Sequence, residues 1–303
     1  MTIPVVFSTD HNFIMPTSVA LVSLLECSTD CSLQIFILQS DDVTDQDRSP
    51  LDELCKRHGA ELHWISLGDA FKGAHETKGR VTIPAYYRLM IPWLLPEMDK
   101  VLYCDGDIIF LQSVSNIFSF NLGDCYLGGV RESGFFKEYR GYKYCRSIGV
   151  DSDGYVNSGV LLMNTRKMRE MNLKEEFMSH AEKKYTFHDQ DIINIVCAGH
   201  IAYMPSVFNR FPTEDSVRID PVIIHYAGNK PWKVFTLFWA NWWDFYSRSP
   251  FFNPELQIRI EATTHSLTHL LHSLRVTLIS SMRRRFPALW RFIDSVRYCR
   301  RQR

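Results

Sequence analysis

Short apolar runs alternate with amphipathic segments over the first part of the chain. Three of these runs are bounded by polar residues, as strands buried on both faces are, and they are residues 3–7, 33–38 and 62–65. Residues 16–25 are apolar at helical spacing, and a second helix is predicted to start at Ser49-Pro50 and to be closed by Gly59. Strands that alternate with helices predict a parallel sheet with crossover helices.

The alternation continues to residue 246. Further strands are predicted at residues 101–104, 126–130, 154–164 and 222–226, and further helices at residues 85–95, 165–184 and 189–198. Residues 134–154 mix glycine with aromatic and basic residues, which indicates a loop or lid. The aromatic residues of 236–246 form a stripe that is more typical of a core than of a binding surface. No internal repeat interrupts this order.

Two carboxylates, Asp105 and Asp107, follow the apolar run 101–104 and are separated only by Gly106. Buried carboxylates are costly unless they are paired, protonated or bound to a cation. Residues at i and i+2 of an extended chain lie on one side of it, where a divalent cation would relieve the repulsion. Hard oxygen ligands suit Mg²⁺ or Mn²⁺, and a glycine between them would let a ligand approach the backbone. An ordinary acidic turn after a strand is the alternative.

Other polar residues stand where predicted strands begin or end. Asp10 follows the strand 3–7 and is therefore expected at the same carboxyl edge as the acid pair, where ligands of such sheets bind. Asn157 and Ser158 lie at the mouth of the strand within 154–164. His225 ends the strand 222–226 ahead of a glycine-containing loop with Lys230, which favours a metal ligand beside a phosphate-binding loop. A surface histidine with ordinary partners is the alternative.

Arg88 and residues 189–191 are further candidates. Arg88 is a single arginine in the apolar segment 82–95, which indicates an anionic or carboxylate partner, although a solvated helical turn is as compatible with the sequence. Residues 189–191, Asp-Gln-Asp, start a predicted helix. Acids in a first helical turn are favoured by capping and by the macrodipole, so one of the three polar groups is expected to be structural.

Composition and length fit a soluble globular protein of 303 residues with an ample core. Eight cysteines without a C-x-x-C spacing make a zinc site unlikely and favour a reducing cytoplasm. The N-terminal residues lack the basic and long apolar regions of a signal peptide. No segment approaches about 20 consecutive apolar residues, so no spanning helix is expected.

The zero net charge hides a basic C-terminal end. Residues 264–303 contain nine arginines and one acid, a net charge of +8, which leaves −8 on residues 1–263. Leucines and aromatic residues recur there at helical spacing among the arginines, as in an amphipathic helix that lies on an anionic membrane. A helix packed on the domain with solvated arginines is the alternative, and nucleic acid is not expected because no recognition module is present.

Six short motifs occur in a fixed order. They are Asp10-x-Asn12, Tyr86-x-Arg88-Leu89, Val101-Leu102-Tyr103-x-Asp105-x-Asp107, Asn157-x-Gly159-Val160, Asp189-Gln190-Asp191 and His225-Tyr226-x-Gly228-x-Lys230-Pro231-Trp232. Each is weak alone, but together they resemble the family-8 retaining glycosyltransferases over about residues 3–235. The most similar members are bacterial lipopolysaccharide and capsule galactosyl- and glucosyltransferases. The resemblance implies a GT-A fold, which is a Rossmann-like α/β arrangement with a mixed, mostly parallel sheet flanked by helices.

The resemblance also implies roles for individual residues. Asp10 and Asn12 match residues that hold the uracil and ribose of a UDP-sugar, and Asp105 matches one that touches the ribose. Asp105, Asp107 and His225 match the ligands of Mn²⁺ (or Mg²⁺), while the loop with Gly228 and Lys230 matches one that closes over the diphosphate. The residues that match those around the donor sugar are Arg88, Asn157, Ser158, Asp189 and Gln190. Three departures from the family's pattern are His11 in place of an acid, Gly106 in place of a bulkier residue, and a loop after His225 that is one residue shorter.

The expected protein is therefore a metal-dependent transferase domain, residues 1–250, followed by a basic helical tail, residues 251–303. It would move glucose or galactose from a UDP-sugar to a hydroxyl of a glycan or lipid-linked acceptor at the inner face of the cell membrane. The family places a glutamine, here Gln190, where a double displacement would need a carboxylate nucleophile, so attack from the leaving-group face is favoured. Asp189 keeps the covalent route open. The rivals are a nucleotidyltransferase, a nucleotide-sugar hydrolase and a non-catalytic UDP-sugar-binding scaffold.

Overall fold

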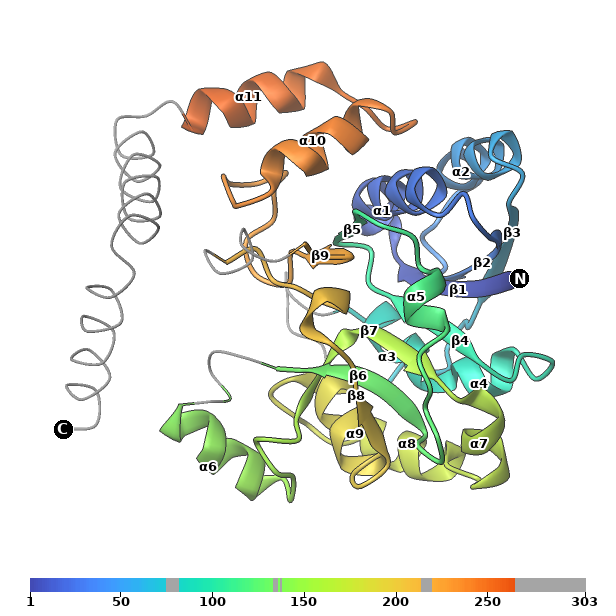
Figure 1. The fold of residues 1–303 in the computed structure, drawn as a ribbon, viewed down its shortest axis with the longest axis vertical. Coiled ribbons are helices and arrows are strands. Elements are labelled where there is room, and N and C mark those ends of the chain that lie inside the picture. Colours follow the sequence, from blue (N-terminus) through green and yellow to red (C-terminus); the bar gives the residue numbers. More distant parts are fainter. Residues whose placement is uncertain (75–81, 133–135, 137, 214–219, 265–303) are drawn as a thin grey trace.

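The computed structural model describes residues 1–74, 82–132, 136, 138–213 and 220–264. Its centre is a seven-stranded sheet in the order β3-β2-β1-β4-β7-β6-β8 (Figure 1). The strands are β1 (Thr2–Thr9), β2 (Ser32–Gln39), β3 (Glu61–Ser66), β4 (Val101–Cys104), β6 (Leu127–Arg131), β7 (Val156–Met163) and β8 (Ile201–Tyr203). β1, β2, β3 and β4 run parallel, and β7 runs antiparallel to both of its neighbours. The predicted mixed, mostly parallel α/β sheet is therefore confirmed.

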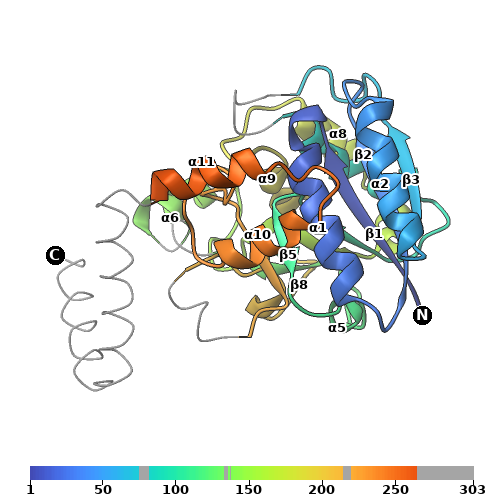
Figure 2. The ribbon, with the colours of Figure 1, turned by 90° about the horizontal axis from the view of Figure 1, so that it is seen from above.

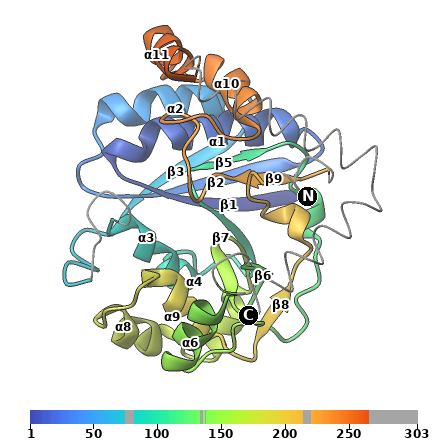
Figure 3. The ribbon, with the colours of Figure 1, turned by 90° about the vertical axis from the view of Figure 1, so that its left-hand side faces the viewer.

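Continuous apolar runs form β1, β2 and β4 because the centre of the sheet is covered on both faces. In β2, Leu33, Ile35 and Ile37 belong to one buried cluster, whereas Phe36 and Leu38 belong to a second cluster on the opposite face. This is the period of two that a strand imposes on its side chains. Helices α1, α2, α10 and α11 lie on one side of the sheet, and α3, α4, α8 and α9 lie on the other (Figure 3).

The helices are mostly short. Their bounds are α1 (Ile14–Cys27), α2 (Asp45–Arg57), α3 (Pro84–Tyr87), α4 (Ile91–Leu94), α5 (Ser115–Phe118), α6 (Tyr139–Ser147), α7 (Thr165–Glu170), α8 (Lys174–Ala181), α9 (His188–Val196), α10 (Trp239–Ser247) and α11 (Pro254–Thr264). Short 3-10 helices are η1 (His11–Phe13), η2 (Arg88–Met90) and η4 (Ser206–Phe208). Seen from above, α1 and α2 run side by side over the sheet (Figure 2).

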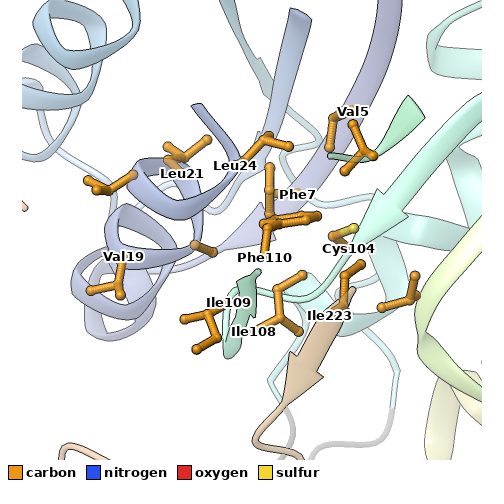
Figure 4. Packing of buried hydrophobic residues seen from close by; sticks show 14 of the residues in the cluster. Val5, Phe7, Val19, Leu21, Leu24, Cys104, Ile108, Ile109, Phe110 and Ile223 are labelled. Carbon is orange, nitrogen blue, oxygen red and sulfur yellow. The ribbon is translucent and has the colours of Figure 1, made fainter. Parts of the chain in front are cut away.

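A second, two-stranded sheet brings distant parts of the chain together. After the turn that holds Asp107, β5 (Ile108–Phe110) pairs antiparallel with β9 (Ile223–His225), so Ile108 lies opposite His225. The side chains of β5 are fully buried and pack with residues of α1 and β1 in one core (Figure 4). Packing of this apolar pair of strands therefore fixes where the polar ends of β5 and β9 meet.

Three predictions about helices were wrong. α2 starts at Asp45 rather than after Ser49, because Thr44 and Asp47 form a capping box and Pro50 is tolerated inside the helix. The predicted loop or lid at 134–154 contains α6, whose Tyr144 and Cys145 pack inward. The single helix predicted at 165–184 is broken into α7 and α8, with Asn172 between them at a φ of 53°.

The aromatic stripe of 236–246 forms α10 and is part of the core, as predicted, with Trp242 and Tyr246 buried. The segment just after α10 is joined to α1 through a hydrogen bond between Ser249 and Ser18. Seven cysteines lie in the described residues, and all seven are free thiols. Among the described residues, no helix combines the length and apolar character needed to cross a bilayer. The tail beyond Thr264, with its predicted amphipathic helix, lies outside the described residues.

Candidate active site

The candidate site lies where the strand order of the sheet reverses, between β1 and β4. β1 is hydrogen-bonded to β2 on one side and to β4 on the other, so the loops after β1 and β4 diverge at a topological switch point. β7 runs antiparallel to β4, which places its first residues beside the last residues of β4, and Asp105 N donates to Gly159 O at 2.8 Å. Asp10 and Asp105, 95 positions apart in the sequence, therefore follow neighbouring parallel strands at one edge of the sheet, where ligand sites of such sheets lie.

Asp105, Asp107 and His225 form the metal-compatible cluster that the sequence predicts. One ligand atom from each of the three residues lies within 4.8 Å of the other two. His225 Nε2 is 3.3 Å from Asp107 Oδ1 and 3.8 Å from Asp105 Oδ2. The two acids stand on a turn between β4 and β5 rather than on an extended chain, and β9 supplies the histidine. Two carboxylates and an imidazole are a suitable donor set for Mn²⁺ or Mg²⁺.

Gly159 is a steric requirement of this cluster. A Cβ atom at this position of β7 would lie 2.2 Å from His225 Cε1 and 2.8 Å from Asp105 Oδ2. Both separations are well below van der Waals contact, so any larger residue would push the histidine and the acid apart. The glycine therefore lets β7 pass directly behind the predicted metal ligands.

Lys230 reaches the same cluster from the loop after β9. Its ammonium group donates to Asp107 Oδ2, and to Tyr226 O at 2.7 Å. Burial alone would raise the pKa of Asp107, but Lys230 and His225 together hold it well below its usual range. Asp107 is therefore a carboxylate at neutral pH, as a metal ligand must be.

Arg88 is buried between the acid turn that holds Asp105 and the start of α9, which holds Asp189. Its guanidinium pairs with Asp105 Oδ1 at 2.9 Å and with Asp189 Oδ2 at 3.1 Å, and it donates to Ser158 O at 2.7 Å. The Tyr103 ring lies 4.4 Å from the guanidinium carbon. The predicted carboxylate partner is confirmed, and the alternative of a solvated turn is wrong because only 4% of Arg88 is exposed.

Asp189 and Gln190 meet Asn157 and Ser158 at the start of α9. Gln190 Oε1 accepts hydrogen bonds from Asn157 Nδ2 at 3.0 Å and from Ser158 N at 3.1 Å. Ser158 Oγ donates to Asp189 Oδ2 at 3.1 Å. Burial raises the pKa of Asp189 to about 6, although Arg88 opposes this shift. The structure therefore brings together the four residues that the resemblance places around a donor sugar with Arg88.

Asp191 is the structural acid of the three polar residues at 189–191. Both of its oxygens accept hydrogen bonds from tyrosines, from Tyr155 OH at 2.5 Å and from Tyr144 OH, and Oδ2 also accepts from Phe187 N at 2.8 Å. Its side chain thereby caps the first turn of α9 and holds α6 against it. The expectation that one of the three residues serves the fold is met by Asp191.

Asp10 and Asn12 lie on the other side of the acid turn, after β1. Asp10 Oδ1 accepts from Phe13 N at 2.9 Å as the cap of η1, and Oδ2 accepts from Thr82 Oγ1 at 2.9 Å. Asn12 is exposed, and so is Gly228 in the loop after β9. His11, the departure from the family's pattern, pairs with Asp47 Oδ2 at 2.9 Å, and this contact raises its pKa.

Gly106 also has a packing role, which the sequence does not predict. A Cβ atom there would lie 2.4 Å from Thr17 Oγ1 and 3.2 Å from Phe13 Cδ1. The glycine allows α1 and the residues before it to pack directly on the acid turn. This contact joins the loop after β1 to the turn after β4.

Two polar residues of the site belong to none of the six sequence motifs. Glu132, just beyond β6, accepts from Asn157 Nδ2 at 2.8 Å. Asn209, just beyond η4, accepts from His225 Nδ1 at 2.9 Å. Asn209 follows no predicted strand, and Glu132 follows the predicted strand 126–130 without standing in a motif, so the three-dimensional arrangement is what reveals both residues.

Comparison with known proteins assigns the fold and the family. The crystal structure of galactosyltransferase LgtC, solved with donor and acceptor sugar analogues, matches with a TM-score of 0.74 and 23% identity over 84% of this chain and 99% of that chain. The fold is therefore the GT-A fold. The model of glycosyl transferase family 8 matches residues 4–236, so the chain belongs to that family.

Relatives of known name are similar over most of their length. The lipopolysaccharide glucosyltransferase WaaO of Escherichia coli is 26% identical over 264 residues, which are 81% of this chain and 75% of the relative. The lipopolysaccharide 1,3-galactosyltransferase of Salmonella typhimurium is 24% identical over 246 residues, which are 75% of this chain and 72% of the relative. The chain is therefore a glycosyltransferase whose relatives include enzymes that transfer glucose and enzymes that transfer galactose.

Proposed function

We propose that this glycosyltransferase moves a hexose from a UDP-sugar to a hydroxyl of a lipopolysaccharide-type glycan, with a divalent metal and with retention of the anomeric configuration. The observation that carries the proposal is the buried Arg88. It joins the metal-compatible acid Asp105 to Asp189, so the residues proposed for the diphosphate and those proposed for the attached sugar are contiguous.

The residues present fit a divalent cation. Asp105, Asp107 and His225 would hold Mn²⁺ or Mg²⁺, and Gly159 leaves them the space to converge. When bound, the ion would act as a Lewis acid on the diphosphate leaving group, an effect worth several kcal/mol. Arg88 keeps Asp105 Oδ1 engaged, so Oδ2 is the oxygen that faces His225.

Lys230 would bind the diphosphate. Its ammonium lies against Asp107, within reach of anything that the acid cluster holds. A lysine in this position stabilises the negative charge that develops on a departing diphosphate. Gly228 in the same loop would lie against the diphosphate, and no protein atom would come within 4 Å of a Cβ atom added there, so packing within the protein does not explain this glycine.

The residues proposed to surround the donor sugar favour attack from the face of the leaving group. Asp189 Oδ2 is ion-paired with Arg88 and accepts a hydrogen bond from Ser158, and these two contacts make the carboxylate a poor nucleophile. Gln190 Oε1 is held by two hydrogen bonds, which fixes a neutral amide oxygen where it can stabilise positive charge on the sugar. A double displacement through Asp189 remains the competing route.

The first test is transfer itself. Purified protein with Mn²⁺, a truncated lipopolysaccharide and UDP-glucose or UDP-galactose should add one hexose in an α-linkage, seen by mass spectrometry and NMR. EDTA should abolish the reaction, because the acid cluster would no longer hold its cation. The variant Gln190→Ala should transfer the hexose more slowly than the wild-type protein.

Other outcomes would contradict the proposal. UDP release that is independent of any acceptor would favour a hydrolase, and release of pyrophosphate would favour a nucleotidyltransferase. Full activity of Gln190→Ala together with a glycosyl adduct on Asp189 would replace same-face attack by double displacement. Absence of UDP-sugar turnover with tight UDP-sugar binding would favour a non-catalytic scaffold.

We also propose that the basic tail, residues 251–303, binds the inner face of an anionic membrane, where a lipid-linked acceptor is available. Each arginine near such a surface contributes on the order of 1 kcal/mol. Removing residues 265–303 should release the protein from vesicles that contain phosphatidylglycerol, measured by co-sedimentation, and should leave transfer to a soluble acceptor intact. Unchanged co-sedimentation would contradict membrane binding by the tail.

A further inference from the structure

We infer that Asn209 is a positioning residue that fixes the ring orientation and tautomer of His225 for metal binding. This inference rests on the proposed metal-dependent function and adds to it a residue outside all six sequence motifs. Asn209 is 5% exposed and lies immediately after η4. Its amide touches two residues of the candidate site.

A chain of hydrogen bonds determines which way each amide points. Asn157 Oδ1 accepts from Gly159 N at 2.9 Å, while Asn157 Nδ2 donates to the Glu132 carboxylate at 2.8 Å. A backbone N–H can only donate and a carboxylate can only accept, so the Asn157 amide has one orientation. Asn209 Nδ2 then donates to Asn157 Oδ1 at 2.8 Å. The remaining atom, Asn209 Oδ1, faces the histidine.

The histidine must therefore carry its proton on Nδ1. Asn209 Oδ1 is an acceptor 2.9 Å from His225 Nδ1, so Nδ1 donates. In the neutral ring, Nε2 is then left with a lone pair, and it is this atom that lies 3.3 Å from Asp107 Oδ1. Metal-binding histidines need this arrangement, in which the nitrogen away from the ion donates to a fixed acceptor.

Backbone contacts hold Asn209 in place beside β9. Arg210 N donates to Ile223 O at 3.0 Å, and His225 N donates to Arg210 O at 2.8 Å. The segment that carries Asn209 is thus paired with the strand that carries His225, so both side chains belong to one rigid unit. Phe211 packs edge-on against the imidazole, with 5.6 Å between the ring centroids.

Loss of such an outer-shell partner typically weakens metal binding 10–100-fold. We therefore expect Asn209→Leu to bind Mn²⁺ about 10–100-fold more weakly than the unchanged protein. Asn209→Asp keeps an oxygen that accepts from Nδ1 but loses the donor to Asn157 Oδ1, so it should restore only part of the affinity. The measurement is a titration of metal-free full-length protein with Mn²⁺, without nucleotide, followed by electron paramagnetic resonance of the free ion.

A control separates positioning from a general loss of stability. Asn164→Ala removes the side chain that accepts from Lys167 N at 3.0 Å as the cap of α7, at the far end of β7 from the cluster. It should lower stability by about 1 kcal/mol and leave the affinity for Mn²⁺ unchanged. If Asn209→Leu does not fold, Asn209→Ser tests the same point, because a serine hydroxyl is too short to reach the ring.

The outcomes distinguish this inference from the function on which it rests. If the wild-type protein binds Mn²⁺ and Asn209→Leu binds it equally well, the role of Asn209 alone is overturned. Asn209→Asp as weak as Asn209→Leu would overturn it too, since the acceptor oxygen would then be irrelevant. Unchanged protein that binds no Mn²⁺ would overturn both the metal-dependent function and the inference.

Discussion

Gly159→Ala is expected to abolish Mn²⁺ binding and to lower kcat/KM for transfer by at least about 100-fold. The added methyl group would lie 2.2 Å from His225 Cε1 and 2.8 Å from Asp105 Oδ2, and the backbone of β7 cannot retreat because it is paired with β4 and β6. The ligands must separate instead. A metal ion contributes several kcal/mol to such a reaction, and each 1.36 kcal/mol is a factor of ten in rate.

Gly128→Ala is the matched control for this prediction. Gly128 lies in β6, the neighbouring strand, and its new methyl group would lie 2.9 Å from Leu122 Cδ2, a side-chain end away from the acid cluster. It should cost stability but keep the affinity for Mn²⁺. Gly159→Ala with unaltered metal binding and turnover would show that β7 does not confine the ligands.

Arg88→Met should destabilise the protein by about 3–5 kcal/mol, the usual cost of removing one partner of a buried ion pair. Asp189 is 5% exposed and would lose its cationic partner, while Asp105 would lose its partner on Oδ1. Denaturant unfolding at pH 7 measures the loss. Transfer activity should fall as well, because the acid turn and the start of α9 would no longer be joined.

Two further variants test the reason for that loss. Arg248→Met removes pairs with Glu26 and Asp244, but this arginine side chain is 40% exposed, so the cost should be about 0–1 kcal/mol. The double variant Arg88→Met/Asp189→Asn should recover part of the stability, since no charge is then left without a partner at Asp189. Strictly additive losses in the double variant would contradict a direct pairing of Arg88 with Asp189.

The sequence predicts every strand of the seven-stranded sheet except β8, because the physical cause of most strands is local. Residues 3–7 and 33–38 are apolar throughout, and only a sheet covered on both faces accommodates such runs, so β1 and β2 follow directly. α6 is different. Its exposed face carries tyrosines and basic residues, and its stability depends on contacts such as Tyr144 with Asp191, which the local pattern does not reveal.

The candidate site likewise contains residues that the sequence predicts and residues that depend on contacts between distant segments. Asp105, Asp107 and His225 lie next to strand ends, so the predicted strands already indicate that they meet at one edge of the sheet. In the structure these three residues form one cluster. Asn209 is fixed by pairing of its neighbour Arg210 with β9, a contact between segments that the sequence does not link. The steric roles of Gly106 and Gly159 are likewise not predictable from the sequence, because they depend on the packing of Gly106 against Thr17 of α1 and of Gly159 against the metal-compatible cluster.

The proposed function requires a cation and a diphosphate to converge at the ends of β4 and β9. A crystal of this protein grown with MnCl₂ and UDP, with data collected at the manganese absorption edge, tests this directly. We expect one anomalous peak bound by Asp105, Asp107 and His225, with Lys230 on the diphosphate. Manganese elsewhere, or UDP bound with these three side chains turned away from it, would contradict the proposed function.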